Sequence, residues 1–307
     1  MPAIENGRFA VQQTEQTSQQ KDDQQQDQQN QTEIPTPAPQ TTRWVAGVEY
    51  NGARFHGWQK QKHQPGVSIQ EALERAIGVV ANHGIDVVCA GRTDAGVHGF
   101  AQVIHFDTTA ERRERSWLLG INSNLPDGIA VNWVQPITTD FHARFSATAR
   151  RYRYFIMNKP VKPGLMHDQV TWWRHALNAD AMHQAAQALL GEHDFTSFRA
   201  RDCQANHPRR TLHDISVMRK GDWVVLEVCA NAFLYHMVRN IVGVLLPIGQ
   251  GEKPVSWAAD VLAAQDRSAA GITAPAEGLY FVDVRYPDFP QLPIDGSGPP
   301  FYQFLSK

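Results

Sequence analysis

The chain has 307 residues, with 29 lysines and arginines against 31 acidic residues, a net charge of −2, and 42% hydrophobic residues. Three cysteines without a Cys-x-x-Cys pair argue against a disulfide framework or a thiolate zinc site. No His-Glu-x-x-His or comparable spacing of metal ligands occurs. We therefore expect no metal site.

The first part of the chain differs in composition from the rest. Twelve glutamines and three prolines lie between residues 11 and 40, with almost nothing that can be buried. This composition predicts a disordered Gln-rich tail over residues 1–41. The tail has neither the apolar run of a signal peptide nor the composition of a transit peptide, so we expect a cytoplasmic protein that makes no membrane contact. Without the first 40 residues the chain is slightly basic, with 27 bases and 25 acids.

The tail is followed by an alternation of strands and helices that predicts an N-terminal α+β domain over residues 42–148. Thr42 to Tyr50 is expected to be a strand, and the capping box Ser68-Ile-Gln-Glu71 is expected to begin a helix that runs to about His83. A second helix is predicted near 115–122 and a strand near 129–135. This order is typical of a sandwich in which one face of the sheet carries helices and the other is free for a ligand.

A glycine-rich turn, Cys89 to His98, joins two of these strands, the apolar run 87–89 and the alternating segment 100–107. The turn carries Arg92, Asp94 and His98, and we expect it to point them outward. Glycines at 91, 96 and 99 permit unusual backbone angles and close approach by another molecule. A plain hairpin connection, with the aspartate capping its own backbone, is the structural alternative. A phosphate-binding loop is disfavoured, because Val97 and His98 occupy the places of its Lys and Ser or Thr.

The following elements predict a second α+β domain over 149–290, a divergent duplicate of the first, and a C-terminal extension over 291–307. The expected strands are 150–157, 211–218, 223–230 and 279–286, with the second and third forming a hairpin. The expected helices are 181–190, ended by Gly191, then 233–248 and 256–264. The helix 233–248 is too short to span a membrane and contains His236, Arg239 and Asn240.

Residues 141–167 contain six basic residues and no acidic residue. Cations and aromatic residues alternate on both faces of the strand that begins at Arg150. A charged edge strand is one explanation. Binding of phosphates, with tyrosines that stack on bases, is the other. A second basic set, Arg199, Arg201, Arg209 and Arg210, favours a long groove.

Arg239 lies on the apolar helix 233–248, where two orientations are possible. It can face solvent, or it can turn inward, where an unpaired charge is costly and an acidic partner is required. Asp94 is the candidate partner that would matter for function.

Five motifs, in order, resemble the bacterial tRNA pseudouridine synthase A family: Gly91-Arg-Thr-Asp-Ala-Gly-Val-His98, Phe141-His-Ala-Arg-Phe-Ser-Ala-Thr-Ala-Arg-Arg-Tyr-Arg-Tyr154, Asp194-Phe-Thr-Ser-Phe-Arg199, His236-Met-Val-Arg-Asn-Ile-Val-Gly243 and Ala276-Glu-Gly-Leu279. The resemblance implies the pseudouridine synthase fold: two pseudo-symmetric α/β-sandwich halves, with mostly antiparallel sheets, around a central RNA-binding cleft. It also implies a cofactor-free homodimer that binds tRNA, not DNA, and converts uridine to pseudouridine at nucleotides 38, 39 and 40 of the anticodon stem-loop.

The resemblance assigns roles to individual residues. Asp94 matches the nucleophile, Tyr152 the tyrosine over the target base, which could also help to remove a proton, and Arg239 the partner of the aspartate. Arg92 matches the residue that assists base flipping. The positions that match RNA contacts are Arg112, Phe141, His142, Ala143, Arg144, Phe145, Asp202, Cys203, Gln204, Ala205 and Asn206.

Two segments depart from the family pattern, the Lys-Pro-Val-Lys-Pro sequence after Asn158 and the Gln-rich tail. An RNA-binding protein without catalysis is the main alternative function, and a glycoside hydrolase would need a second carboxylate beside Asp94. The sequence does not decide whether the aspartate attacks the base or the ribose.

Overall fold

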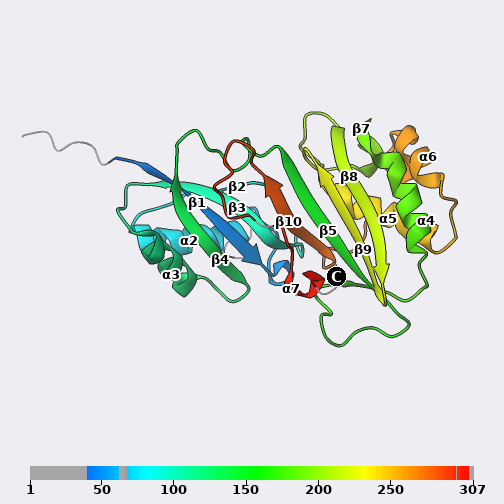
Figure 1. Ribbon diagram of the computed structural model, residues 1–307, viewed down its shortest axis with the longest axis horizontal. Coiled ribbons are helices and arrows are strands. Elements are labelled where there is room, and N and C mark those ends of the chain that lie inside the picture. Colours follow the sequence, from blue (N-terminus) through cyan, green and yellow to red (C-terminus); the bar gives the residue numbers. More distant parts are fainter. Residues whose placement is uncertain (1–39, 62–65, 67, 295, 304–307) are drawn as a thin grey trace, which may run out of the picture. The chain divides into compact units, whose positions relative to one another are not determined.

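A computed structural model describes residues 40–61, 66, 68–294 and 296–303 (Figure 1). The part of the chain that begins at Thr41 forms one compact unit. It is an α+β structure built on a ten-stranded sheet, which confirms the predicted fold class. The predicted tail lies outside the described residues, apart from its last two positions.

The sheet has the main strand order β4-β1-β3-β10-β5-β9-β8-β7, with β2 paired to β3 and β6 paired to β5. Its pairs are antiparallel except β10 with β3 and β5 with β6. The strands are β1 Thr42–Tyr50, β2 Val88–Cys89, β3 His98–Thr108, β4 Ile129–Ile137, β5 Ala149–Asn158, β6 Thr171–Trp173, β7 Gly191–Asp194, β8 Arg209–Lys220, β9 Trp223–Ala230 and β10 Leu279–Arg285.

The described helices are α2 Ile69–Ala81, α3 Glu114–Asn124, α4 Ala179–Ala186, α5 Met237–Gly249, α6 Trp257–Ala264 and α7 Pro300–Gln303, with short 3-10 helices η1 Gly52–Arg54, η2 Gln187–Leu189, η3 Thr196–Phe198 and η4 Arg267–Ala269. The predicted capping box is present at the start of α2, where the Ser68 side chain accepts from the Glu71 N–H and the Glu71 carboxylate accepts from the Ser68 N–H. This reciprocal cap confirms the start of the first helix.

Two predicted helices have different limits in the structure. The helix expected from Phe233 begins at Met237, because His236 adopts a positive φ of 61°, which no residue inside a right-handed helix can have. The helix expected to reach residue 190 is α-helical only to Ala186 and then tightens into η2. The short strands β6 and β7 were not predicted.

The C-terminal strand β10 joins the two predicted halves into a single sheet. It lies between β3 and β5, and its Tyr280 and Phe281 pair in parallel with His98 and Gly99 at the start of β3. The sheet is therefore continuous across the boundary predicted at residue 148. The domain limits remain a prediction, but this pairing brings residues 276–281 against the glycine-rich turn.

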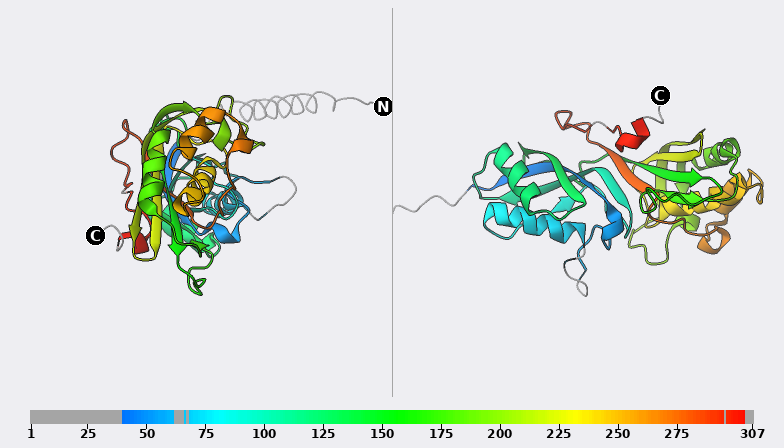
Figure 2. Two further views of the ribbon diagram at one scale, coloured as in Figure 1. Left: turned by 90° about the vertical axis from the view of Figure 1, so that its right-hand side faces the viewer. Right: turned by 90° about the horizontal axis from the view of Figure 1, so that it is seen from below.

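The two faces of the sheet are covered differently. Tyr152, Tyr154 and Ile156 of β5 share a core with apolar residues of α5. Phe155 and Met157 point to the other face, where Phe301 and Tyr302 pack against them. Figure 2 shows α7, in red, on the side of the sheet opposite α5. The C-terminal segment thus covers part of the face of β5 that points away from α5.

Candidate active site

The turn predicted to carry the chemistry, which we call the Asp94 loop (residues 90–98), is fixed by side chains from the sheet. Gln102 is fully buried, and its amide donates to the Gly91 carbonyl at 2.6 Å and accepts from the Gly91 N–H at 3.3 Å. The Tyr50 hydroxyl shares a hydrogen bond of 2.9 Å with the Thr93 hydroxyl. Both side chains hold the loop on either side of Arg92, so the backbone that presents Asp94 is pre-organised.

The glycines of this region serve protein packing. A Cβ on Gly99 would lie 2.4 Å from the Tyr50 ring, and a Cβ on Gly91 would lie 3.2 Å from Phe281 and 3.7 Å from the Tyr152 hydroxyl. Of glycines 91, 96 and 99, only Gly96 has a positive φ, of 80°. The prediction that these glycines admit another molecule is therefore wrong for Gly91 and Gly99, because protein side chains occupy the space.

Asp94 faces Arg239, as the inward alternative for this arginine predicted. Arg239 Nη1 lies 3.3 Å from Asp94 Oδ2, and the two side chains are 15% and 17% exposed. Arg239 Nε also donates to the Ala274 carbonyl at 2.8 Å, which orients the guanidinium. Arg239 lies in the first turn of α5, so the positive end of the helix dipole adds to the field at the carboxylate. Asp94 is therefore partly accessible and paired with Arg239, on the helix-bearing side of the sheet.

Tyr152 lies beside the Asp94 loop in an aromatic pocket. Its ring is buried and meets Phe233 and Phe281 edge to face, with centroids 5.0 and 5.2 Å away. Burial raises the pKa of the Tyr152 phenol above its usual range, and the nearby Tyr50 and Asp94 raise it further. The phenol therefore stays protonated at neutral pH, which argues against its expected help in removing a proton and leaves it a role in packing and hydrogen bonding.

His98 does not point outward with Asp94, contrary to the prediction. Its Nδ1 accepts from the Gly52 N–H at 3.1 Å, so Nε2 carries the proton and donates to the Glu277 carbonyl at 3.1 Å. Its ring stacks on Tyr280, with centroids 4.5 Å apart. Burial lowers the pKa of His98 to about 4, so it is neutral at pH 7. His98 is a structural joint between β3 and the Ala276 to Leu279 segment.

Residues 141–145 are divided between core and surface. Phe141 and Ala143 are fully buried, and Phe141 packs on Tyr286 and Phe289. Their side chains are not available to RNA, so their assignment as RNA contacts is corrected. Arg144 is exposed and Phe145 is 75% exposed, while His142 is half-buried. The backbone N–H groups of Arg144 and Phe145 both point to His142 Nδ1, which fixes this exposed pair.

The other predicted RNA contacts lie in two places. Arg92, on the Asp94 loop, and Arg112, before α3, are both exposed. In the segment 202–206, Asp202, Gln204 and Asn206 are exposed, whereas Cys203 and Ala205 are half-buried. Arg199 holds this segment, because it donates to the Cys203 and Ala205 carbonyls at 2.6 and 2.8 Å.

The arginines of β5 do not form a phosphate groove, and β5 is not an edge strand, since it pairs with both β10 and β9. Arg151 pairs with Glu227 and Asp214, and Arg153 pairs with Glu227. Arg150 donates to the carbonyls of Ala90, Arg144, Ala147 and Asn231. Both interpretations of the basic run are thus wrong for these three residues, since each guanidinium donates to partners within the protein.

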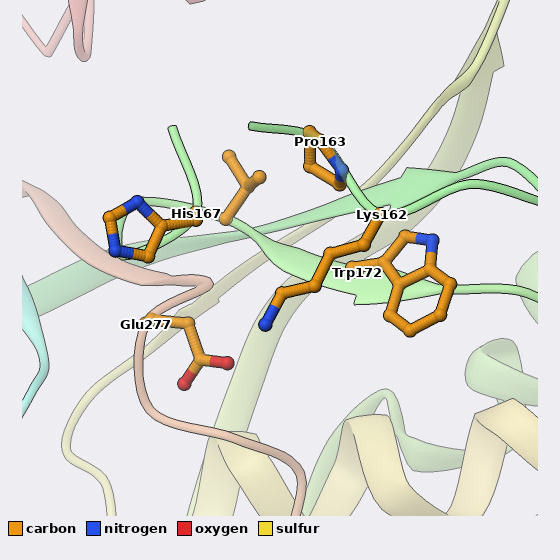
Figure 3. A pocket seen from close by; sticks show the side chains of 6 residues that line it. Lys162, Pro163, His167, Trp172 and Glu277 are labelled. Atoms are coloured by element: carbon orange, nitrogen blue, oxygen red, sulfur yellow. The ribbon is translucent and has the colours of Figure 1, made fainter. Parts of the chain in front are cut away.

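A cavity of about 100 Å³ lies between the segment 162–172 and Glu277. Figure 3 shows the Lys162 ammonium pointing toward the Glu277 carboxylate across it, with Trp172 and His167 at its sides. Since the Glu277 carbonyl accepts from His98, the cavity borders the structural joint, and Asp94 is not among its lining residues.

Within the described residues, no group of three or more His, Cys, Asp or Glu side chains is arranged to hold a metal ion. Likewise, no described helix has the length and apolar character needed to cross a membrane.

Several residues that build the site were not found from the sequence. Gln102 and Tyr50 resembled ordinary strand residues, and Ala274 contributes only its carbonyl. His236 lies 3.5 Å from Asp94 Oδ2, but its position before Arg239 gave no signal of this contact. The polar glutamine in the middle of an apolar strand was the one usable sign, because a buried amide must find partners.

Comparison with known proteins identifies the family. A family model described as tRNA pseudouridine synthase matches residues 46–146 and 185–287. The tRNA pseudouridine synthase A of Tolumonas auensis is 55% identical over 257 residues, which cover 84% of this chain and 98% of that protein. The proteins of the same name from Shewanella amazonensis and Escherichia fergusonii are 54% identical, covering 84% and 86% of this chain and 98% and 97% of theirs. The chain belongs to the tRNA pseudouridine synthase family.

Proposed function

We propose that this protein is an isomerase that converts uridine to pseudouridine at nucleotides 38, 39 and 40 of the tRNA anticodon stem-loop, with Asp94 as nucleophile. The observation that carries the proposal is the contact of Asp94 with Arg239, two residues 145 positions apart, beside the buried Tyr152. A protein that only bound RNA would gain nothing from a partly buried carboxylate, which repels phosphate.

The reaction needs no cofactor. The bond between N1 and the ribose breaks, the uracil turns, and C5 is joined to the ribose, while a proton leaves C5 and N1 gains one. Atoms and charge balance within the nucleotide, so an ionised carboxylate and a pocket that holds the uracil are sufficient. Arg239 orients the Asp94 carboxylate, and Tyr152 closes one side of the pocket.

A paired uridine must leave its stack before Asp94 reaches it, at a cost of roughly a few kcal/mol. Contacts with phosphates offset this cost, and the exposed Arg144 and Arg112 are the candidates for them. Phe145 is exposed enough to stack on a base. Arg92, exposed and two residues before the nucleophile, is placed to fill the vacated space. The exposed Asp202, Gln204 and Asn206 extend the proposed surface.

The proposal includes a homodimer in the cytoplasm, with the cleft between the halves 42–148 and 149–290 as the tRNA site. Residues 291–307 are a C-terminal extension, and residues 1–41 a Gln-rich tail. These elements rest on the family resemblance and the sequence composition.

Mapping of pseudouridines tests this proposal. Purified protein is incubated with tRNA transcripts that carry a single uridine at position 38, 39 or 40, and the product is located by chemical derivatisation and sequencing. We expect pseudouridine at each of the three positions and at no uridine outside the anticodon stem-loop. Modification elsewhere would overturn the site assignment, and absence of any pseudouridine would overturn the activity.

A further inference from the structure

The two oxygens of Asp94 have different surroundings. Oδ2 lies 3.3 Å from Arg239 Nη1 and 3.5 Å from His236 Nε2. Among the described residues, no polar contact reaches Oδ1. The carboxylate is thus held from one side only. The histidine distance is long for a hydrogen bond, as is common for catalytic contacts before substrate is bound.

His236 reaches this position through an unfavourable backbone conformation. It is one of four non-glycine residues with positive φ in the described part of the chain. Asn82 and Gln265 cap the C-termini of α2 and α6, where this conformation is common. His236, with φ 61°, is instead the N-cap of α5, where extended backbone is usual. Such an outlier persists only where its surroundings impose it, and it points to function.

Hydrogen bonds before and after His236 in the chain impose this backbone conformation. The His236 carbonyl accepts from the Asn240 N–H at 2.9 Å, which begins α5. On the other side, the Tyr235 carbonyl accepts from the Ala200 N–H at 3.0 Å, and the Tyr235 N–H lies 3.4 Å from Cys203 Sγ. The rings of Tyr235 and His236 also lie against each other, with centroids 4.0 Å apart. The backbone at Tyr235 and His236 is therefore held between α5 and residues 200–203, and the imidazole lies against the Tyr235 ring.

We propose that His236 is a positioning residue that, together with Arg239, fixes Oδ2 of Asp94 so that Oδ1 is turned toward the substrate nucleotide. The inference rests on the proposed role of Asp94. Two contacts to one oxygen define the rotation of the carboxylate, which a single contact from Arg239 leaves free. A nucleophile that is oriented before the uridine arrives loses less freedom on reaction.

His236 acts as a neutral group in this arrangement. Burial lowers its pKa, and Arg239 and Arg267 lower it further, while Asp94 and Asp202 oppose the shift. Tyr235, whose ring lies against His236, is a further titratable neighbour, and burial raises its pKa. Acidification through the pKa of His236 would place a second cation on Asp94 and weaken it as a nucleophile.

Replacement of the imidazole tests the proposal, with His236→Gly as the main variant because glycine accepts positive φ. We expect single-turnover pseudouridine formation to slow by roughly 10- to 100-fold, as for a small misplacement of a reacting group. The tRNA dissociation constant should change less than about threefold, because His236 makes no expected phosphate contact. Added imidazole should restore the rate, and N-methylimidazole should not. The matched control is Gln265→Gly, which replaces another positive-φ residue at a helix end and should keep the wild-type rate.

His236→Gln provides a second readout through the pH profile. We expect the wild-type rate to fall as the pH decreases through the pKa of His236, and this step to be absent in the glutamine variant.

A wild-type rate in His236→Gly, with Asp94→Asn inactive, would overturn this inference and leave the proposed function intact. Loss of tRNA affinity without loss of rate, or a slow variant that imidazole does not rescue, would also overturn it. Absence of pseudouridine with the wild-type protein would instead refute the proposed function.

Discussion

The two faces of β5 carry similar residues and serve different purposes. On one face, Arg150 and Tyr152 point toward the Asp94 loop and α5. On the other, Arg151 and Arg153 form ion pairs with Glu227 of β9. The sequence of alternating arginine and tyrosine does not distinguish these faces.

Partners from distant strands make the difference. On the face of β5 that points away from the Asp94 loop, which we call the back face, Glu227 neutralises Arg151 and Arg153. Tyr302 covers Arg153, with the guanidinium carbon 3.9 Å from the ring centroid. On the face toward the Asp94 loop, which we call the site face, Arg150 donates hydrogen bonds to backbone carbonyls. One of them is the carbonyl of Ala90 at the start of the Asp94 loop. The carboxylate of that loop is matched by Arg239 of α5. Arg239 is thus assigned to the reaction because its partner, Asp94, is the proposed nucleophile. Arg151 and Arg153 are structural, because Glu227 only neutralises them.

The largest effect is expected on the site face. Arg239→Leu removes the guanidinium from Asp94, and we expect single-turnover pseudouridine formation to fall by roughly 10²- to 10³-fold, the usual cost of losing one preorganised charged donor. Arg239→Lys should lose less, since it keeps the charge but not the geometry that bonds to the Ala274 carbonyl. Equal rates in the leucine variant and the wild type would separate Arg239 from the reaction.

On the back face the effect should be on stability. Glu227→Ala leaves Arg151 and Arg153 partly buried without their shared partner, and we expect the free energy of unfolding to fall by about 3 kcal/mol. Denaturant titration measures this change. Glu192→Ala is the matched control, because Glu192 and its partner Arg209 are each 65% exposed and 3.8 Å apart. The control should cost less than about 1 kcal/mol. Equal losses in both variants would contradict a buried ion-pair network.

The contribution of His98, the structural joint behind the Asp94 loop, to the free energy of unfolding should decrease in acid. The pKa of His98 is lowered by burial to about 4, below its value of 6.5 when unfolded. The unfolded state therefore binds the proton more readily, so the contribution of His98 is complete above pH 6.5 and falls away as the pH drops toward 4. The loss is about 3 kcal/mol at most. In His98→Gln, which does not titrate, unfolding measured from pH 7 to 4 should show a smaller decrease, and an unchanged decrease would exclude His98 as its source.

The smallest effect is expected at the surface. Arg144→Ala should weaken tRNA binding by about tenfold and lower the slope of log K against log salt by about 1, because one phosphate contact is lost. Arg75→Ala, an exposed position on α2, should change neither quantity. An unchanged slope in Arg144→Ala would remove this residue from the tRNA surface.

Local signals predicted most of the elements, whereas the role of Asp94 came from the family resemblance and stays a proposal. The capping box at Ser68 fixed the start of α2, and strand alternation fixed β1 and the hairpin of β8 and β9. The insertion of β10 between β3 and β5 was not predictable, because strand pairing over such separations leaves no local pattern. The late start of α5 was missed for a related reason, since the conformation of His236 is imposed by contacts with residues 200–203.

Within the site, charge was easier to predict than burial. Asp94 and Arg239 could be matched because a buried arginine requires an acid. The run from Arg150 was misread, since Glu227 and Asp214 lie more than 60 positions away in the chain. Phe141 and Ala143 were taken for contacts with RNA because the family resemblance assigns this role to the whole segment 141–145. The structure shows that the segment alternates between core and surface.

The central claim is that Asp94 acts in the chemistry and not in binding, and Asp94→Asn tests it most directly. The amide keeps the size and position of the carboxylate but is neutral and a poor nucleophile. We expect no pseudouridine above background in tRNA from cells that lack the wild-type protein and carry this variant, while purified Asp94→Asn binds tRNA within about threefold of the wild-type affinity. Pseudouridine formation by the variant at a rate within about tenfold of the wild type would contradict the account.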